Sequence, residues 1–168
     1  LRGGITDLYA VDLRTGQSRQ LTDDRFADLQ PMFSPDGRTI AFTTDRGETD
    51  FNTRSFGDYR LALMDFASGE IRTIEPPAAA EGQRQMGKNI NPQWSRDGRA
   101  LFYISDRTGI ANIYRVEIAS GAVTQVTDLF TGVSGITDMS PAISAAQNAD
   151  KLVFTAYERG GFNIYTIT

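Results

Sequence analysis

The stretch Pro31-Met-Phe-Ser-Pro-Asp-Gly37 precedes the apolar run Ile40-Ala-Phe-Thr-Thr44, and the same pair returns as Pro92-Gln-Trp-Ser-Arg-Asp-Gly98 and Leu101-Phe-Tyr-Ile-Ser105. Residues 34–37 form a tight turn, because proline presets φ, aspartate caps the backbone and glycine takes the left-handed conformation. The runs that follow are β-branched and aromatic, which predicts strands. Each copy is therefore expected to be a β-hairpin.

This hairpin belongs to a longer unit that is written three times. A second tight turn places an acidic residue four positions before a glycine, and its glycines Gly16, Gly69 and Gly121 are 53 and 52 residues apart. A third apolar run lies at 152–154, and a strand motif that opens the unit begins again at 163. A fixed period in this range indicates an array of one supersecondary unit.

Each unit contains four short strands, named A to D in chain order, and no long window shows helical periodicity. Four-stranded antiparallel sheets at this period predict an all-β protein, a β-propeller of four-stranded blades. The position of each motif within the repeat predicts a half blade at 1–30, full blades at 31–75 and 91–127, and an incomplete blade at 140–168. Propellers close with about four to eight blades, so the expected structure is an incomplete arc. Such an arc is expected to rest on further sequence or on a second copy.

The repeated turns are expected to be structural, because their acids accept hydrogen bonds from turn amides. The turn residues are Asp12, Gly16, Asp36, Gly37, Asp65, Gly69, Asp97, Gly98 and Gly121. Phe33 and Trp94 occupy the same position in strand A, so both are expected in the core. The pairs Asp45-Arg46 and Asp106-Arg107 recur once per blade, which favours a structural ion pair or turn cap over catalysis.

The composition argues against several classes of function. The 168 residues carry 17 basic and 21 acidic side chains, a net charge of −4, which argues against nucleic-acid binding. The absence of cysteine and histidine removes thiolate nucleophiles and imidazole acid–base chemistry. No run approaches about 18 consecutive apolar residues, so no span of a membrane is expected. We therefore expect no enzyme activity, no cofactor and no metal.

Two short motifs suggest chemistry but lack essential parts. Glu48-x-Asp50-x-Asn52 alternates oxygen ligands as a calcium loop does, yet it lacks the glycine and the final glutamate of such loops. Gly132-Val-Ser-Gly135 lacks the spacing of a nucleophile elbow, and no histidine exists to activate its serine. Both are better interpreted as polar loops.

The loops differ between the two ends of the blades. The A–B and C–D turns lie at one end of the blades, here called the hairpin rim, and the acid-to-glycine spacing is four in all three C–D turns. The B–C and D–A connections, here called the long-loop rim, vary: the B–C loop at 45–60 is nine residues longer than its counterpart at 106–112. Length variation on one face is typical of a binding surface on a repeat scaffold. Its candidate partner-binding residues are Phe51, Arg54, Phe56, Arg84, Met86, Lys88 and Phe130. The alternative is that the aromatic residues fold back onto their own blades and the charges are solvated.

The motif set Pro-x-[Phe/Trp]-Ser-x-Asp-Gly, Ile-Ala-Phe-x-x-Asp-Arg and [Asp/Asn]-[Ile/Leu]-Tyr resembles the WD-like propeller repeat of the bacterial TolB family over essentially the whole chain. The resemblance implies a periplasmic or extracellular module that binds another protein or complex, including the periplasmic face of a membrane complex. The competing hypothesis is the substrate-gating propeller of a larger serine peptidase, with catalysis in a separate domain. A Gly-x-Ser-x-Gly motif in adjoining sequence would favour the peptidase.

Overall fold

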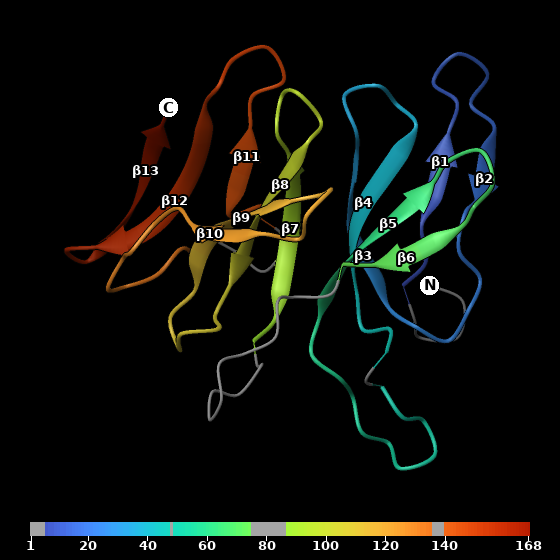
Figure 1. The fold of residues 1–168 in the computed structure, drawn as a ribbon, viewed down its shortest axis with the longest axis horizontal. Coiled ribbons are helices and arrows are strands. Elements are labelled where there is room, and N and C mark those ends of the chain that lie inside the picture. Colours follow the sequence, from blue (N-terminus) through green and yellow to red (C-terminus); the bar gives the residue numbers. More distant parts are fainter. Residues whose placement is uncertain (1–5, 48, 75–86, 136–139) are drawn as a thin grey trace.

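A computed structural model of the chain describes residues 6–47, 49–74, 87–135 and 140–168. Every regular element within these ranges is a β-strand (Figure 1). The strands are β1 (Tyr9–Val11), β2 (Ser18–Gln20), β3 (Asp28–Phe33), β4 (Thr39–Thr44), β5 (Arg60–Asp65), β6 (Ile71–Thr73), β7 (Asn89–Trp94), β8 (Ala100–Ser105), β9 (Asn112–Glu117), β10 (Val123–Gln125), β11 (Ile143–Ala145), β12 (Leu152–Glu158) and β13 (Gly161–Ile167). The described residues include no helix long and apolar enough to cross a membrane.

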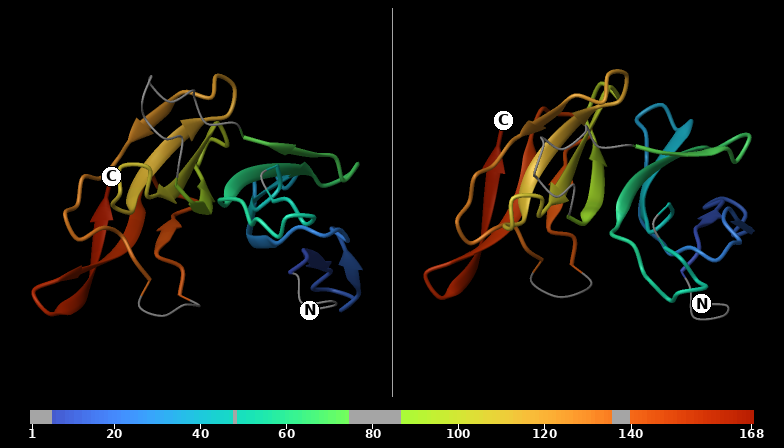
Figure 2. Two further views of the ribbon diagram at one scale, coloured as in Figure 1. Left: turned by 90° about the horizontal axis from the view of Figure 1, so that it is seen from below. Right: turned by 60° about the horizontal axis from the view of Figure 1, so that its bottom comes forward.

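The strands form four antiparallel sheets, each made of strands that follow one another in sequence. Their orders are β1-β2, β3-β4-β5-β6, β7-β8-β9-β10 and β11-β12-β13. The sheets stand side by side in chain order as an open arch, with the β1-β2 sheet and the β11-β12-β13 sheet at its opposite ends (Figures 1 and 2). The predicted fold class, two full blades between partial blades, is confirmed.

Alternating side chains bury both faces of each full blade. In β4, Ile40 and Phe42 point into a cluster shared with Leu8, directly before β1, whereas Ala41 points into a cluster shared with Trp94 of β7. Strand β5 divides its residues in the same way between the two clusters. A third cluster joins β8 and β9 to the last sheet around Ile143 and Phe154. The cores are therefore interfaces between blades, as the two-residue period of a strand dictates.

The first strand of each blade, here called the inner strand, also connects neighbouring blades. These strands are β3, β7 and β11. The Trp94 Nε1 atom donates a 3.0 Å hydrogen bond to the carbonyl of Met32, across the interface of the two full blades. At the next interface, Asn91 Nδ2 donates to the carbonyl of Ile143 at 3.3 Å, and the Ala145 amide donates to Gln93 Oε1 at 3.3 Å. The arch is thus held by polar contacts at its inner strands as well as by apolar cores.

The expectation that Phe33 lies in the core is wrong. Trp94 is buried, but its counterpart Phe33 is 47% exposed and makes an edge-on ring contact with Phe66, with centroids 5.1 Å apart. The two residues differ in exposure because they face different sheets. Trp94 faces a four-stranded blade, whereas Phe33 faces the β1-β2 sheet, which has no inner strand among the described residues.

Candidate protein-interaction face

The two rims of the arch are separated in space. The β3–β4 and β7–β8 turns lie together at the top of Figure 1, and the loop that follows β4 and the loop that follows β8 project at the bottom. The elaborated connections thus gather on one side of the blades, the side that the loop lengths predict as a binding surface.

On the hairpin rim, the repeated acids hold the turns. Asp12 Oδ1 accepts the Arg14 and Thr15 amides at 2.8 and 3.0 Å. Asp65 Oδ1 does the same for the amides of Ala67 and Ser68, at 3.0 and 2.7 Å. In the A–B turns, Asp36 accepts Ser34 Oγ at 2.6 Å and the Arg38 amide at 3.1 Å, and Asp97 accepts Ser95 Oγ and the Arg99 amide at the same distances. The turn glycines Gly16, Gly37, Gly69, Gly98 and Gly121 have φ between 70° and 76°.

These hydrogen bonds favour the ionised carboxylates. The Ser34 hydroxyl, helped by the Arg38 amide, holds the pKa of Asp36 below its ordinary value of 3.8. The Ser95 hydroxyl and the Arg99 amide lower the pKa of Asp97, and the Ser68 amide and hydroxyl lower that of Asp65. All three side chains serve their own turns, so the hairpin rim shows a structural use of its acids.

The long B–C loop on the opposite rim carries one packed and one free aromatic residue. Residues Asp50 and Ser55 pair as an isolated antiparallel bridge, which gives the loop a hairpin of its own. The Phe51 ring lies 5.7 Å from that of Phe26 and below the guanidinium of Arg25, so it folds back on the protein. Phe56 is 76% exposed. Arg54 is exposed at a φ of 57°.

The other candidate residues belong to the D–A connections. Phe130 is 92% exposed, and Lys88 is exposed directly before β7. The loop of Phe130 is anchored beside the preceding B–C loop, because the Val133 amide donates a 2.6 Å hydrogen bond to the carbonyl of Ala111. Arg84 and Met86 lie outside the described residues. The structure thus places free apolar side chains from two connections, Phe56 and Phe130, on the long-loop rim.

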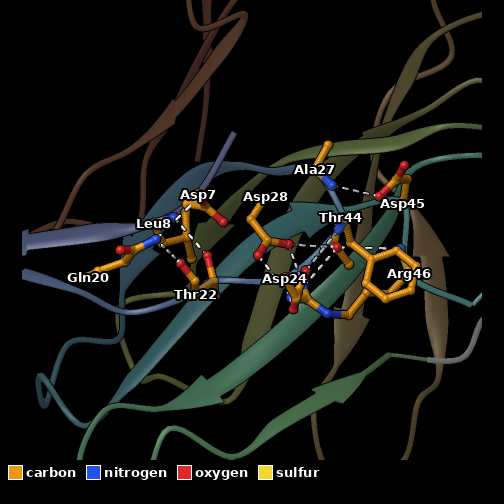
Figure 3. Close-up of polar contacts among 11 residues, drawn as sticks. Asp7, Leu8, Gln20, Thr22, Asp24, Ala27, Asp28, Thr44, Asp45 and Arg46 are labelled. Carbon is orange, nitrogen blue, oxygen red and sulfur yellow. Dashed lines mark hydrogen bonds and ion pairs between the residues drawn. The ribbon is translucent and has the colours of Figure 1, made fainter. Parts of the chain in front are cut away.

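A part-buried ion-pair cluster lies at the long-loop rim of the first full blade (Figure 3). Arg46 donates to the carboxylates of Asp28 and Asp24, with Nη2 and Asp28 Oδ2 3.0 Å apart. Thr44 Oγ1 donates to Asp28 Oδ1 at 2.7 Å. Asp45 is not the partner of Arg46: its carboxylate caps the Ala27 amide at 2.8 Å. In the first full blade, Asp45-Arg46 is therefore a turn cap and an ion pair, made to different residues.

Burial affects the two partners of this pair differently. Desolvation raises the pKa of Asp28, against the hydrogen bonds from Arg46 and Thr44 that lower it. For Arg46, burial alone would lower the pKa, but the hydrogen bonds to Asp28 and Asp24 raise it above its ordinary value. One guanidinium therefore serves two carboxylates, which keeps it charged.

Two grooves between blades lie on the hairpin rim, and nothing in the repeat predicts them. A groove of about 470 Å³ between the two full blades is lined by acids and one arginine, namely Asp36, Asp65, Glu70, Asp97 and Arg72. A groove of about 710 Å³ between the second full blade and the last sheet has an apolar lining with a mixed charged edge, including Phe102, Leu152, Ile167, Arg96, Arg115, Lys151 and Asp150. Trp94 lines both. These grooves depend on the packing of blades, which the spacing of motifs does not specify.

No cluster that could hold a metal ion occurs among the described residues. The position of Glu48 in the calcium-like motif lies outside them. The Asp50 carboxylate accepts the Asn52 amide at 2.9 Å, which lowers the pKa of Asp50. This contact makes Asp50 the cap of its own loop.

The sheets define the class of the protein: antiparallel blades that share apolar cores with their neighbours make a β-propeller. No family profile matches the chain. A TolB homologue from Chlorobium chlorochromatii is 31% identical over 143 residues, which cover 85% of this chain and 27% of that protein. The dipeptidyl-peptidase 5 of Porphyromonas gingivalis is 24% identical over 127 residues, 73% of this chain and 16% of that protein.

A solved structure gives the same result for the fold. The putative TolB from Agrobacterium tumefaciens superposes with a TM-score of 0.71 at 22% identity, over 99% of this chain and 54% of that one. The blades of this protein are TolB-like β-propeller repeats. The chain spans about a quarter or less of the length of the two curated relatives described above.

Proposed function

We propose that the protein is a non-enzymatic protein-interaction module that docks on an envelope or membrane-protein complex through its long-loop rim. The observation that carries this proposal is the pair Phe56 and Phe130, large apolar side chains that are 76% and 92% exposed on the same rim. Aromatic and arginine side chains are the usual anchors of interfaces, and Arg54 is exposed next to Phe56. The TolB-like repeats support a periplasmic or extracellular location and a protein as the partner.

Copurification tests the proposal. The chain, tagged and expressed in the organism that encodes it, is purified after cross-linking as wild type, as the double variant Phe56→Ser and Phe130→Ser, and as Leu13→Ser. Leu13 is the matched control, because it is 97% exposed but lies in a turn of the hairpin rim. We expect the partner to be lost only from the double variant. Equal retention by all three proteins would contradict docking through the long-loop rim.

The second candidate is the substrate-gating propeller of a serine peptidase, which the match to a dipeptidyl-peptidase favours. In that case the partner of the long-loop rim is a catalytic domain rather than an envelope protein. The sequence of the gene that encodes the chain distinguishes the two. A Gly-x-Ser-x-Gly motif together with a histidine in the same open reading frame would replace the docking proposal by the peptidase.

A further inference from the structure

The second full blade repeats the ion-pair site of the first but lacks its acid. In the first blade, Asp28 pairs with Thr44 across β3 and β4, and Arg46 follows two residues later. In the second, Asn89 pairs with Ser105 across β7 and β8, and Arg107 follows two residues later. The register is the same, so Asn89 stands where the first blade has the carboxylate of Asp28.

Among the described residues, Arg107 is consequently a cation without a counter-ion. Its Nε donates to Ser105 Oγ at 3.2 Å, and its Nη2 donates to the Tyr103 hydroxyl. Its guanidinium lies 4.6 Å from the ring centroid of Tyr114. Within the part of the chain that the structure describes, no carboxylate lies within 4.0 Å of it, and its Nη1 has no acceptor. A guanidinium stays protonated in proteins, so a half-buried one is stabilised by any carboxylate that reaches it.

The surroundings of Arg107 leave other polar groups unmatched. Among the described residues, the buried hydroxyl of Tyr114, whose ring contacts the guanidinium, has no hydrogen-bond partner. Asn89 and Arg107 line the same small cavity, of about 10 Å³. Asp106 is the nearest acid in sequence, but it makes no ion pair with Arg107; its Oδ1 lies beside Gly87 and has no hydrogen-bond partner among the described residues. Lys88, exposed beside Asn89, adds positive charge to the rim.

We propose that Arg107 is a receptor for a carboxylate, supplied by an acidic side chain of the protein that docks on the long-loop rim. The first blade shows the route of approach. Asp24 reaches Arg46 from the D–A connection while its side chain remains 38% exposed, so in the first blade a carboxylate approaches the arginine from the solvent side. Arginine binds carboxylates with paired, charge-assisted hydrogen bonds, which suits it to this role. The source of the carboxylate rests on the proposed function, but the site does not.

Acetate is the probe that tests the site alone. The ¹H–¹⁵N signals of the arginine Nε–H groups of the full chain are titrated with sodium acetate, with sodium chloride as the control, and are assigned with R46K and R107K. We expect the Arg107 signal to shift saturably with acetate and not with chloride. The Arg46 signal should not move, because that guanidinium already holds two carboxylates.

The variant N89D supplies the missing acid from within the blade. We expect it to shift the Arg107 signal toward that of Arg46 and to abolish the response to acetate. A wild-type Arg107 signal that ignores acetate, or that responds equally to chloride, would overturn the proposal without the variant. Such a failure would leave docking through Phe56 and Phe130 standing, because copurification measures that separately.

Discussion

The backbone amide of Asn91 donates a 2.8 Å hydrogen bond to Oε1 of Gln30, which joins the inner strands of the two full blades. Both residues precede a proline, both have left-handed φ values of 59° and 53°, and both lie at a bulge in their strand pairing. Thr43 Oγ1 donates to the same oxygen at 3.1 Å. An irregular residue in each blade therefore forms the contact between blades.

Replacing Gln30 by alanine should lower the free energy of unfolding by about 1–2 kcal/mol, because the Asn91 amide is part-buried and loses its shorter hydrogen bond. The same amide keeps only a 3.3 Å contact with Thr43 Oγ1. Urea unfolding followed by tryptophan fluorescence measures the change, since Trp94 lies at the same interface. Gln17→Ala is the control, as Gln17 is exposed on the hairpin rim. Equal midpoints for both variants would contradict the role of Gln30.

The glycine of a C–D turn should resist replacement. Gly69 has a φ of 76° with open space around it, so Gly69→Ala is expected to cost about 1–2 kcal/mol through backbone conformation alone. Gly161 also has open space, but its φ is outside the left-handed region, which makes Gly161→Ala a matched control with little cost. Thermal unfolding of both variants measures the difference. A larger loss for Gly161→Ala would show that conformation does not decide the choice of glycine at 69.

Stability should fall in acid through the turn carboxylates. The folded-state pKa of Asp65 lies below its ordinary value of 3.8, so below about pH 4 the unfolded chain binds more protons and the folded state loses stability. Asp65→Asn should therefore flatten the loss of stability on acidification. Urea midpoints measured at a series of pH values below neutral test this.

The pKa of Asp28 is shifted in the opposite direction to that of Asp65, so the two residues should affect the pH dependence of stability in opposite ways. Burial raises its folded-state pKa above 3.8, so its contribution to stability is present in acid and declines as the pH rises through that raised pKa. Asp28→Asn should consequently steepen the acid loss that Asp65→Asn flattens. Curves that change in the same direction in both variants would contradict the assignment.

The face of the last sheet should make the isolated chain associate. Ile164 is 70% exposed on β13, and Val153, Tyr157 and Phe162 are exposed large apolar residues of the same sheet. Exposed apolar patches of this kind favour association. Sedimentation velocity should show species that grow with concentration in wild type and decrease with Ile164→Lys, but not with Leu13→Lys. A wild-type chain that stays monomeric at all concentrations would contradict this expectation.

The repeat predicted much of this structure because turns and alternating strands are local. The Asp-Gly turns, the apolar runs and the uniform acid-to-glycine spacing each depend on a few neighbouring residues, so they can be read one copy at a time. The burial of Trp94 follows from such a pattern. The exposure of Phe33 does not, because it depends on which sheet lies beside it in space.

The candidate site was predicted less completely for the same reason. The loop lengths indicated the long-loop rim, and Phe56 and Phe130 are free on it. The contact of Phe51 with Phe26 depends on the fold of two loops and is not visible in either sequence segment. An alignment of the two copies places Asn89 opposite Asp28. The consequence of this difference becomes visible only in the structure, where Asp28 forms an ion pair with Arg46.

Site-specific photo-cross-linking tests most directly whether a partner protein sits on the long-loop rim. Benzoylphenylalanine is placed at Phe130 in one protein and at Leu13 in another, since both side chains are more than nine-tenths exposed and lie on opposite rims. We predict one discrete adduct from position 130 in cells that encode the protein, and none from position 13. An adduct from position 13 without one from position 130 would place the partner on the hairpin rim and contradict the account.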